Sequence, residues 1–437
     1  MIETEISTLG EFGLIEQLTK DVQIKNSTTQ MGVGDDCAVL DYSSDCNLRA
    51  LVTTDVLLEG IHFDLTYTPL RHLGYKAAVV NFSDVYAMNG QPKQITVSLG
   101  ISKRFTVEHI NELYAGIRLA CEQYGVDIVG GDTSASVTGL IISITCIGEG
   151  EEGKIVYRGG ARDTDLVCVS GDLGAAYMGL QLLEREREAG AGEKDFQPDF
   201  SGREYILERQ LKPEARRDVI AELKELGIQP TAMMDVSDGL SSELLHICKD
   251  SNVGCRIYED RIPIDYQTAV MAEELNMNLV TAAMNGGEDY ELLFTVPLTD
   301  HEKVQKMKSA KLIGRITKPE LGAFMVTRDD AEIAFARRAG TLSPQKRKRN
   351  NSMGNIPNST IAWGRDFGMF PMFVKICACF HAMMCFFLAL HIFKKFIRLE
   401  FTSFREEMLI YSNIKTLCIV FHCNHFKTRQ LHFTTTI

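Results

Sequence analysis

The sequence lacks the usual phosphate-binding motifs. No Gly-x-x-x-x-Gly-Lys-Ser/Thr pattern occurs, which excludes a P-loop. Gly32-Val33-Gly34 lacks the third glycine of a dinucleotide-binding fingerprint, and the acidic residues Asp35 and Asp36 stand where a pyrophosphate would lie. An Asp-x-Asp-x-Asp-Gly calcium loop is also absent. Any phosphate chemistry in this chain must therefore use another kind of site.

Positive charge is scarce in the first 344 residues. From Gln345 to Ile437, 13 Lys and Arg stand against 4 Asp and Glu, so 33 basic and 54 acidic residues precede Gln345. A body this acidic repels polyanions, which makes nucleic acid an unsuitable partner. A phosphate-bearing substrate would need metal ions to bridge the like charges.

The cysteines lack the short paired spacing of a structural zinc site. Before Gln345 they are scattered singly, and only one residue separates Cys377 from Cys379. The N-terminus is polar and acidic, without the apolar core of a secretory signal. We therefore expect reduced thiols and a cytoplasmic location.

Short apolar runs alternate with helical patterns through most of the chain. With 437 residues there is room for two domains, and the alternation predicts an α/β (α+β) two-domain fold. We place an N-terminal metal- and ATP-binding domain at residues 1–150 and a C-terminal α/β domain at 151–343. The clearest helix runs from Thr106 to Tyr124, because Thr106 is a good N-cap and Gly125 a good stop.

Residues 344–437 differ abruptly in composition from the rest. They hold five of the twelve cysteines, thirteen of the twenty-two phenylalanines and a basic run, Lys346 to Arg349. Ile376 to Phe393 carries no formal charge and could just span a bilayer. Three interpretations stay open: translation beyond or out of frame with the natural end of the gene, a membrane anchor, or a soluble appendage. A membrane is a partner only if the segment 376–393 is genuine.

Six short acidic segments follow short apolar runs, a pattern typical of loops at the ends of buried strands. Carboxylates gathered from several strand ends would form an oxygen-rich site, the ligand set that Mg²⁺ prefers. Each segment could instead be a turn or a helix cap. Because six share one pattern, we favour phosphoryl transfer assisted by several Mg²⁺ ions. The segments are Val33-Gly34-Asp35-Asp36, Val52-Thr53-Thr54-Asp55, Asn81-Phe82-Ser83-Asp84, Gly130-Gly131-Asp132-Thr133, Asp235-Val236-Ser237-Asp238-Gly239 and Gly286-Gly287-Glu288-Asp289.

Seven segments in the same order resemble bacterial thiamine-monophosphate kinases, collinearly from about Leu9 to Glu332. They are Gly10 to Ile15, Gly32 to Ala38, Thr53-Thr54-Asp55 with His62-Phe63, Ala78 to Asp84, Gly130 to Thr133, Asp235 to Leu240 and Gly286 to Glu291. The resemblance implies the aminoimidazole-ribotide-synthetase-like fold, with an N-terminal and a C-terminal domain and a homodimer formed through N-terminal strands. It also implies that ATP, as co-substrate, phosphorylates the phosphate of thiamine phosphate.

The resemblance implies roles for individual residues. The Mg²⁺ ligands of the family correspond to Asp36, Thr53, Thr54, Asp55, Asp84, Asp132, Asp235 and Asp238. The ATP contacts of the family correspond to Tyr114, Gly131, Asp132, Arg158 and Ser237. His62 and Glu288 correspond to substrate contacts. No residue is expected to act as a general acid or base, because the acceptor phosphate is already an anion.

The sequence departs from the family pattern near the end of the matching region. An aromatic residue after a glycine is thought to stack on the substrate there, but no aromatic follows Gly340. Two other functions stay open: another ATP-dependent synthetase of the same superfamily, or a non-catalytic Mg²⁺- and nucleotide-binding protein tethered by the tail.

Overall fold

The computed structural model describes residues 13, 15, 19, 26–42, 47–191 and 197–335. The chain divides into two compact units, Met1–Arg347 and Lys348–Ile437, and every described residue belongs to the first. The basic run, the segment 376–393 and Gly340 all lie outside the described residues. No helix within the described part is long and apolar enough to cross a membrane.

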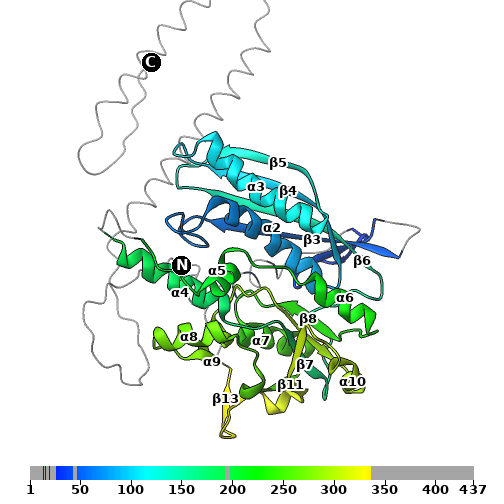
Figure 1. Ribbon diagram of the computed structural model, residues 1–437. Coiled ribbons are helices and arrows are strands. Elements are labelled where there is room, and N and C mark those ends of the chain that lie inside the picture. Colours follow the sequence, from blue (N-terminus) through cyan, green and yellow to red (C-terminus); the bar gives the residue numbers. More distant parts are fainter. Residues whose placement is uncertain are drawn as a thin grey trace, which may run out of the picture. The chain divides into compact units, whose positions relative to one another are not determined.

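The first sheet has six strands in the order β1-β2-β3-β6-β4-β5 (Figure 1). Only β4 and β5 pair in parallel. Buried and partly exposed residues alternate along β6, as expected for a sheet with one face packed on helices. The strands are β1 (Thr29–Met31), β2 (Ala38–Leu40), β3 (Leu48–Leu58), β4 (Gln91–Ile101), β5 (Asp127–Ala135) and β6 (Ile141–Glu151).

Two long helices, α2 (Leu70–Ala87) and α3 (Val107–Tyr124), pack closely together beside this sheet (Figure 1). A Cβ atom on Gly74 would lie 1.9 Å from the carbonyl oxygen of Leu113, so the helices touch backbone to backbone there. The predicted helix from Thr106 to Tyr124 is confirmed. The Thr106 hydroxyl accepts a hydrogen bond from the His109 N–H, and Gly125 ends the helix with φ 72°.

The second sheet has seven strands in the order β13-β12-β9-β11-β7-β10-β8, and only β12 and β9 pair in parallel. Alternate residues of β7 belong to two different apolar clusters, one on each face. Burial on both faces explains why β7 begins with a continuous apolar run, Leu166 to Val169. The strands are β7 (Leu166–Ser170), β8 (Ala232–Asp235), β9 (Gly254–Tyr258), β10 (Leu292–Val296), β11 (Ala310–Thr317), β12 (Ala323–Val326) and β13 (Glu332–Ala334).

Helices cover both faces of the second sheet. One face packs on α7, the other packs on α6 and α10, and a separate apolar cluster joins α4, α5, α8 and α9. The helices are α4 (Ala175–Ala189), α5 (Glu204–Leu211), α6 (Arg217–Glu225), α7 (Leu240–Ser251), α8 (Tyr266–Glu274), α9 (Leu279–Asn285) and α10 (His301–Val304). Short 3-10 turns are η1 (Glu259–Arg261), η2 (Leu298–Asp300) and η3 (Pro319–Leu321).

The prediction that all six acidic segments are loops is wrong for three of them. Thr53-Thr54-Asp55 lies within β3, Asn81–Asp84 within α2, and Gly130–Thr133 within β5. The error in α2 has a clear cause, since residues 73–83 are all buried. A helix buried on every side has no amphipathic period, and its apolar run cannot be distinguished from a strand. The other three segments are loops, as predicted, although the first residue of one of them, Asp235, is the last residue of β8.

Candidate active site

Three carboxylates from separate elements meet where the two sheets approach α2. Asp84 lies near the end of α2, Asp235 is the last residue of β8, and Asp36 lies between β1 and β2. One oxygen of each lies within 4.8 Å of the others. Asp36 is 9% exposed and Asp235 is 3% exposed. We call these three residues the acidic cluster.

Two neighbouring elements hold the acidic cluster in place. The Thr53 hydroxyl of β3 donates a hydrogen bond to Asp84 Oδ2 at 2.6 Å, and the Ser83 hydroxyl donates to Asp235 Oδ2. The backbone N–H of Asp55 donates to the Asn81 side chain at 3.1 Å. Strand β3 therefore turns Thr53 and Asp55 toward α2, because alternate residues of a strand share a face.

The carboxyl groups in and beside the acidic cluster have raised pKa values. Burial raises the pKa of Asp235 to about 7, with repulsion from Asp36 adding to the effect, and burial raises the pKa of Asp55 to about 6. The pKa of Asp84 is well above its usual range, first through burial and then through repulsion from Asp55, Asp235 and Asp36. Buried charges of one sign are costly unless a counter-ion balances them.

Arg158 is the cation that contacts the acidic cluster. Its Nε donates to Asp36 Oδ1 at 3.1 Å, and its Nη2 donates to the same oxygen. Asp36 Oδ2 is buried without a hydrogen-bond partner. An orphaned carboxylate oxygen beside two further carboxylates fits a hard divalent cation.

A second group of polar residues surrounds Glu288, in the loop after α9. The Lys76 ammonium of α2 donates to Glu288 Oε2 at 2.9 Å, and the Gln210 amide donates to the same oxygen at 3.1 Å. Lys76 also donates to the Gln210 carbonyl at 3.0 Å. Lys76 and Gln210 line a pocket with His62 and several apolar side chains, Leu57, Phe63, Tyr67, Leu73, Leu180 and Leu211.

The tautomer of His62 follows from its contacts. The Leu58 N–H donates to His62 Nδ1 at 3.0 Å, so a neutral ring carries its proton on Nε2. Burial lowers the pKa of His62, while the charge of Glu288 opposes that shift. We call the surroundings of His62, Lys76, Gln210 and Glu288 the acceptor pocket, after the role that we propose for it below.

Helix α2 joins the acceptor pocket to the acidic cluster. Lys76 and Asp84 both lie on this helix, a little over two turns apart, which is about 12 Å along its axis. A single rigid element therefore sets the distance between the two sites.

Comparison with known proteins identifies the family. Two family models match: "AIR synthase related protein, N-terminal domain" over residues 34–149, and "AIR synthase related protein, C-terminal domain" over residues 165–326. The thiamine-monophosphate kinase of Aquifex aeolicus (strain VF5) is 36% identical over 320 residues, covering 73% of this chain and 95% of that protein. That of Bacillus subtilis (strain 168) is 35% identical over 310 residues, covering 71% and 90%. The chain belongs to the thiamine-monophosphate kinase family.

Solved structures agree with this assignment. The structure described as "AaThiL complexed with AMPPCP and TMP" has a TM-score of 0.65 and 34% sequence identity, covering 76% of this chain and 97% of that one. The HypE–HypF complex has a TM-score of 0.55 at 22% identity, which shows a shared fold alone. The family resemblance and the two-domain fold class predicted from the sequence are confirmed, while the predicted dimer stays a prediction.

The structure brings some of the predicted site residues together and leaves others apart. Asp36, Thr53, Asp55, Asp84, Asp235 and Arg158 meet at the acidic cluster, and His62 and Glu288 meet at the acceptor pocket. The Thr54 hydroxyl is directed elsewhere, because it donates to the carbonyl of Ile144 in β6. Ser237 and Asp238 follow Asp235 after Val236, in the loop that leads to α7, and Asp238 is exposed.

Three further predicted residues lie outside both sites. Asp132 and Gly131 belong to β5, an edge strand exposed along its whole length. Gly131 is required there, because a Cβ atom would lie 1.9 Å from the Val97 carbonyl oxygen. Tyr114 is partly buried in α3 and packs against the core of the first sheet.

Lys76 and Gln210 were not among the residues predicted from the sequence. Lys76 left a usable signal, since it is a lone charge inside the apolar run that leads to Asp84. A charge inside a buried run needs a buried partner, which makes it a candidate for a functional site. Gln210 left no such signal, because its role depends on how α5 packs.

Proposed function

We propose that this protein transfers the γ-phosphoryl group of ATP to the phosphate of thiamine phosphate, in one direct step that forms thiamine diphosphate. The family assignment supports the reaction. The observation that carries the proposal is the pair of sites on α2, with the acidic cluster at one end and the acceptor pocket at the other.

Mg²⁺ is the cation that we assign to the acidic cluster. Asp36, Asp84 and Asp235 would hold it, with Thr53 and Asp55 beside them and Asp132, Asp238 and Thr54 as further ligands in the loaded site. When bound, Mg²⁺ neutralises phosphate charge and favours an in-line arrangement of donor and acceptor. We expect several ions, because each accepts few protein carboxylates.

The protein's own groups orient the two substrates. Arg158, a permanent cation beside Asp36, is placed to stabilise charge on a transferring phosphoryl group. Tyr114, Gly131, Asp132 and Ser237 are the further ATP contacts that we propose. In the acceptor pocket, Glu288 supplies a carboxylate for the cationic thiazolium ring and His62 supplies an Nε2–H donor.

Three organisational features belong to the same proposal. We propose domains at 1–150 and 151–343, followed by an anomalous tail at 344–437. A homodimer through the N-terminal strands is supported by β5, whose residues Ile128 and Val129 are 37% and 57% exposed at a sheet edge. A cytoplasmic location is supported by Cys37, Cys121, Cys146, Cys168, Cys248 and Cys255, which are all free and buried.

The test is to incubate the full chain with ATP and Mg²⁺, with and without thiamine phosphate, and to follow both ADP and the phosphorylated product. We expect ADP release that requires thiamine phosphate and matches the thiamine diphosphate formed. ADP release that is independent of thiamine phosphate, or a different phosphorylated product, would contradict the proposal.

A further inference from the structure

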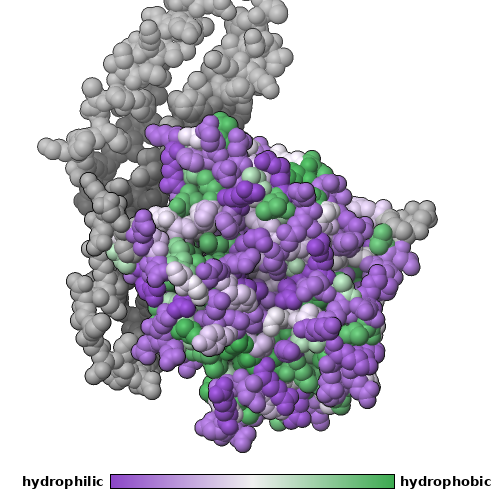
Figure 2. All heavy atoms as spheres, viewed as in Figure 1, coloured by the Kyte–Doolittle hydropathy of each residue, from purple (hydrophilic) through white to green (hydrophobic). Residues whose placement is uncertain are grey.

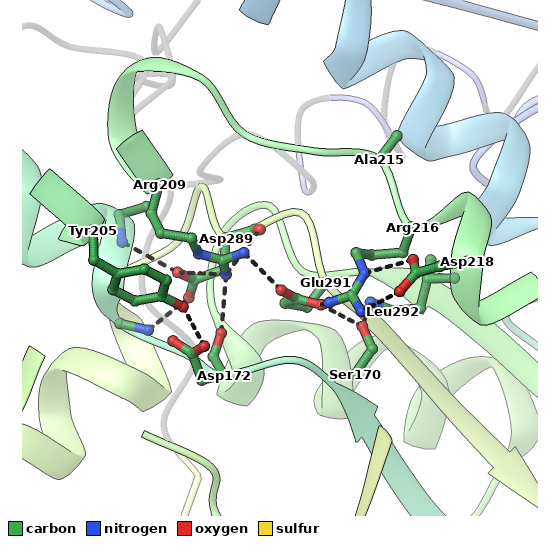
Figure 3. A network of polar contacts seen from close by, with 12 residues as sticks. Ser170, Asp172, Tyr205, Arg209, Ala215, Arg216, Asp218, Asp289, Glu291 and Leu292 are labelled. Atoms are coloured by element: carbon green, nitrogen blue, oxygen red, sulfur yellow. Dashed lines mark hydrogen bonds and ion pairs between the residues drawn. The ribbon is translucent and has the colours of Figure 1, made fainter. Parts of the chain in front are cut away.

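Glu291 is a fully buried carboxylate held between two arginines (Figure 3). Arg209 of α5 donates from Nη1 to Glu291 Oε1 at 2.7 Å. Arg216, just before α6, donates to Oε2, and so does the Ser170 hydroxyl. The arginine side chains are only 13% and 15% exposed. We call Arg209, Glu291 and Arg216 the arginine clamp.

The arginine clamp leaves no room for a side chain at position 171. A Cβ atom on Gly171 would lie 2.2 Å from Glu291 Oε1 and 2.6 Å from Arg216 Nη1, and Gly171 has φ 52°. Burial alone would lower the pKa of both arginines, but contacts that include Glu291 outweigh burial and raise it. Buried ion pairs often add little net stability, so this arrangement calls for another explanation.

The loop before Glu291 is held in a strained backbone conformation. Glu288 has φ 60° and Tyr290 has φ 51°, in the left-handed region that bulky side chains avoid. The Glu288 N–H donates to the Ser237 carbonyl at 2.6 Å, and the Tyr290 N–H donates to the Val236 carbonyl at 2.9 Å. A strained backbone conformation persists only where several surrounding contacts hold it in place.

Arg209 ties together residues on both sides of Tyr290. Besides pairing with Glu291, its Nη2 lies 3.8 Å from Asp289 Oδ1. Asp289 in turn accepts hydrogen bonds from the N–H groups of Gly174 and Ala176, at the start of α4. The loop is therefore anchored to both α4 and α5, the helices that contribute Leu180 and Gln210 to the acceptor pocket.

We propose that Glu291, fixed by Arg209 and Arg216, is a positioning residue for the acceptor pocket, holding residues 286–290 in the strained form that directs Glu288 to Lys76. Glu291 acts through the loop, since its own carboxylate contacts Arg209, Arg216 and Ser170. The proposal rests on the proposed function in one respect, that this pocket takes the phosphate acceptor.

The kinetic test compares Arg216→Met with Asp218→Asn. Asp218 pairs with the same arginine on its outer side and is 59% exposed, so it is a matched control. We expect Arg216→Met to raise the KM for thiamine phosphate about tenfold, with the KM for ATP and kcat changed less than about threefold. Arg216→Lys should recover part of the loss, and Asp218→Asn should match the wild type.

A second measurement separates this proposal from the proposed function. Hydrogen exchange of a peptide covering residues 286–292 reports the Glu288 and Tyr290 amides whatever the acceptor is. We expect Arg216→Met to speed exchange there at least about tenfold while a β6 peptide stays unchanged. Asp218→Asn should leave both peptides as in the wild type.

Two results would overturn the proposal. One is unchanged exchange at residues 286–292 in both Arg216→Met and Glu291→Gln. The other is an equal rise in both KM values that Arg216→Lys does not recover. If thiamine phosphate is not phosphorylated even by the wild type, the proposed function fails, and exchange alone decides the role of Glu291.

Discussion

The acidic cluster and the arginine clamp both bury carboxylates, but they balance the charge differently. In the arginine clamp, Glu291 meets two guanidinium groups and one hydroxyl. In the acidic cluster, Asp84 and Asp235 contact hydroxyl groups, and Arg158 pairs with Asp36. The charged groups of the clamp are paired within the protein, although Arg209 Nε is buried without a hydrogen-bond partner. The cluster, in contrast, has a deficit of positive charge that an external cation would fill.

This difference separates a binding site from a structural support. The carboxylates of the acidic cluster repel one another, which costs stability and creates affinity for a cation. The arginine clamp can support the acceptor pocket because the Glu291 carboxylate is balanced by groups of the protein itself. The face shown in Figure 2 is mostly hydrophilic, with smaller hydrophobic areas between, as is usual for a folded protein.

The largest expected effect comes from removing one charge of the acidic cluster. Asp84→Asn keeps the shape of the side chain and an acceptor for the Thr53 hydroxyl, but it weakens the cation site. We expect kcat for thiamine diphosphate formation to fall about a thousandfold or more, since metal-ion stabilisation contributes several kcal/mol. The measurement is the steady-state rate at saturating ATP, Mg²⁺ and thiamine phosphate. A loss below tenfold would place the cation elsewhere.

The same type of change in the arginine clamp should act on stability. Glu291→Gln leaves Arg209 and Arg216 buried without a carboxylate, and breaking a buried pair costs about 3–5 kcal/mol. Urea unfolding of the wild type and the variant gives the difference in the free energy of unfolding. Asp218→Asn, the exposed control, should change it by less than about 1 kcal/mol. Equal effects in the two variants would remove the distinction between clamp and surface.

Without metal, Asp84→Asn should change stability in the opposite direction from Glu291→Gln. Removing one of the mutually repelling charges should raise the free energy of unfolding in EDTA by about 0.5–2 kcal/mol at pH 8. Added Mg²⁺ should stabilise the wild type more than the variant, because binding favours the folded state. Destabilisation in EDTA would show that Asp84 is balanced within the protein after all.

An effect on stability of similar size is a pH dependence caused by Asp289. Burial raises the pKa of Asp289 to about 7, against the opposing effect of Arg209, with Glu291 adding to the rise. Because the folded pKa is raised, the stabilisation is complete below the unfolded value and is lost as pH rises through 7. Between pH 5 and 8, the wild type should lose about 2 kcal/mol relative to Asp289→Asn. Parallel pH curves from urea unfolding would contradict this.

The sequence indicated which carboxylates form the acidic cluster better than it indicated how they come together. Carboxylates beside small residues identified Asp36, Asp84 and Asp235, because their type and local pattern are visible in the chain. Their convergence depends on α2 reaching the edge strand β8, a long-range contact without a local signal. The acidic segment of α2 was assigned to a loop for a different reason. Because the helix is buried on every side there, its sequence lacks the helical period of apolar residues.

Sequence patterns gave correct predictions for features that depend on residues close together in the chain. The caps at Thr106 and Gly125 fixed one helix, because capping depends on residues within one turn. The arginine clamp could not be predicted in this way. Glu291 lies 82 residues from Arg209 and 75 from Arg216 along the chain, so its pairing depends on tertiary packing alone.

The most direct test of the acidic cluster as a cation site is equilibrium binding of Mn²⁺ to the nucleotide-free chain, followed by electron paramagnetic resonance. Mn²⁺ is a suitable probe because it takes the same oxygen ligands as Mg²⁺. We predict saturable binding to the wild type and to Asp218→Asn, weakened at least about tenfold in Asp84→Asn. Equal binding by all three proteins would contradict the assignment of the acidic cluster as the metal site.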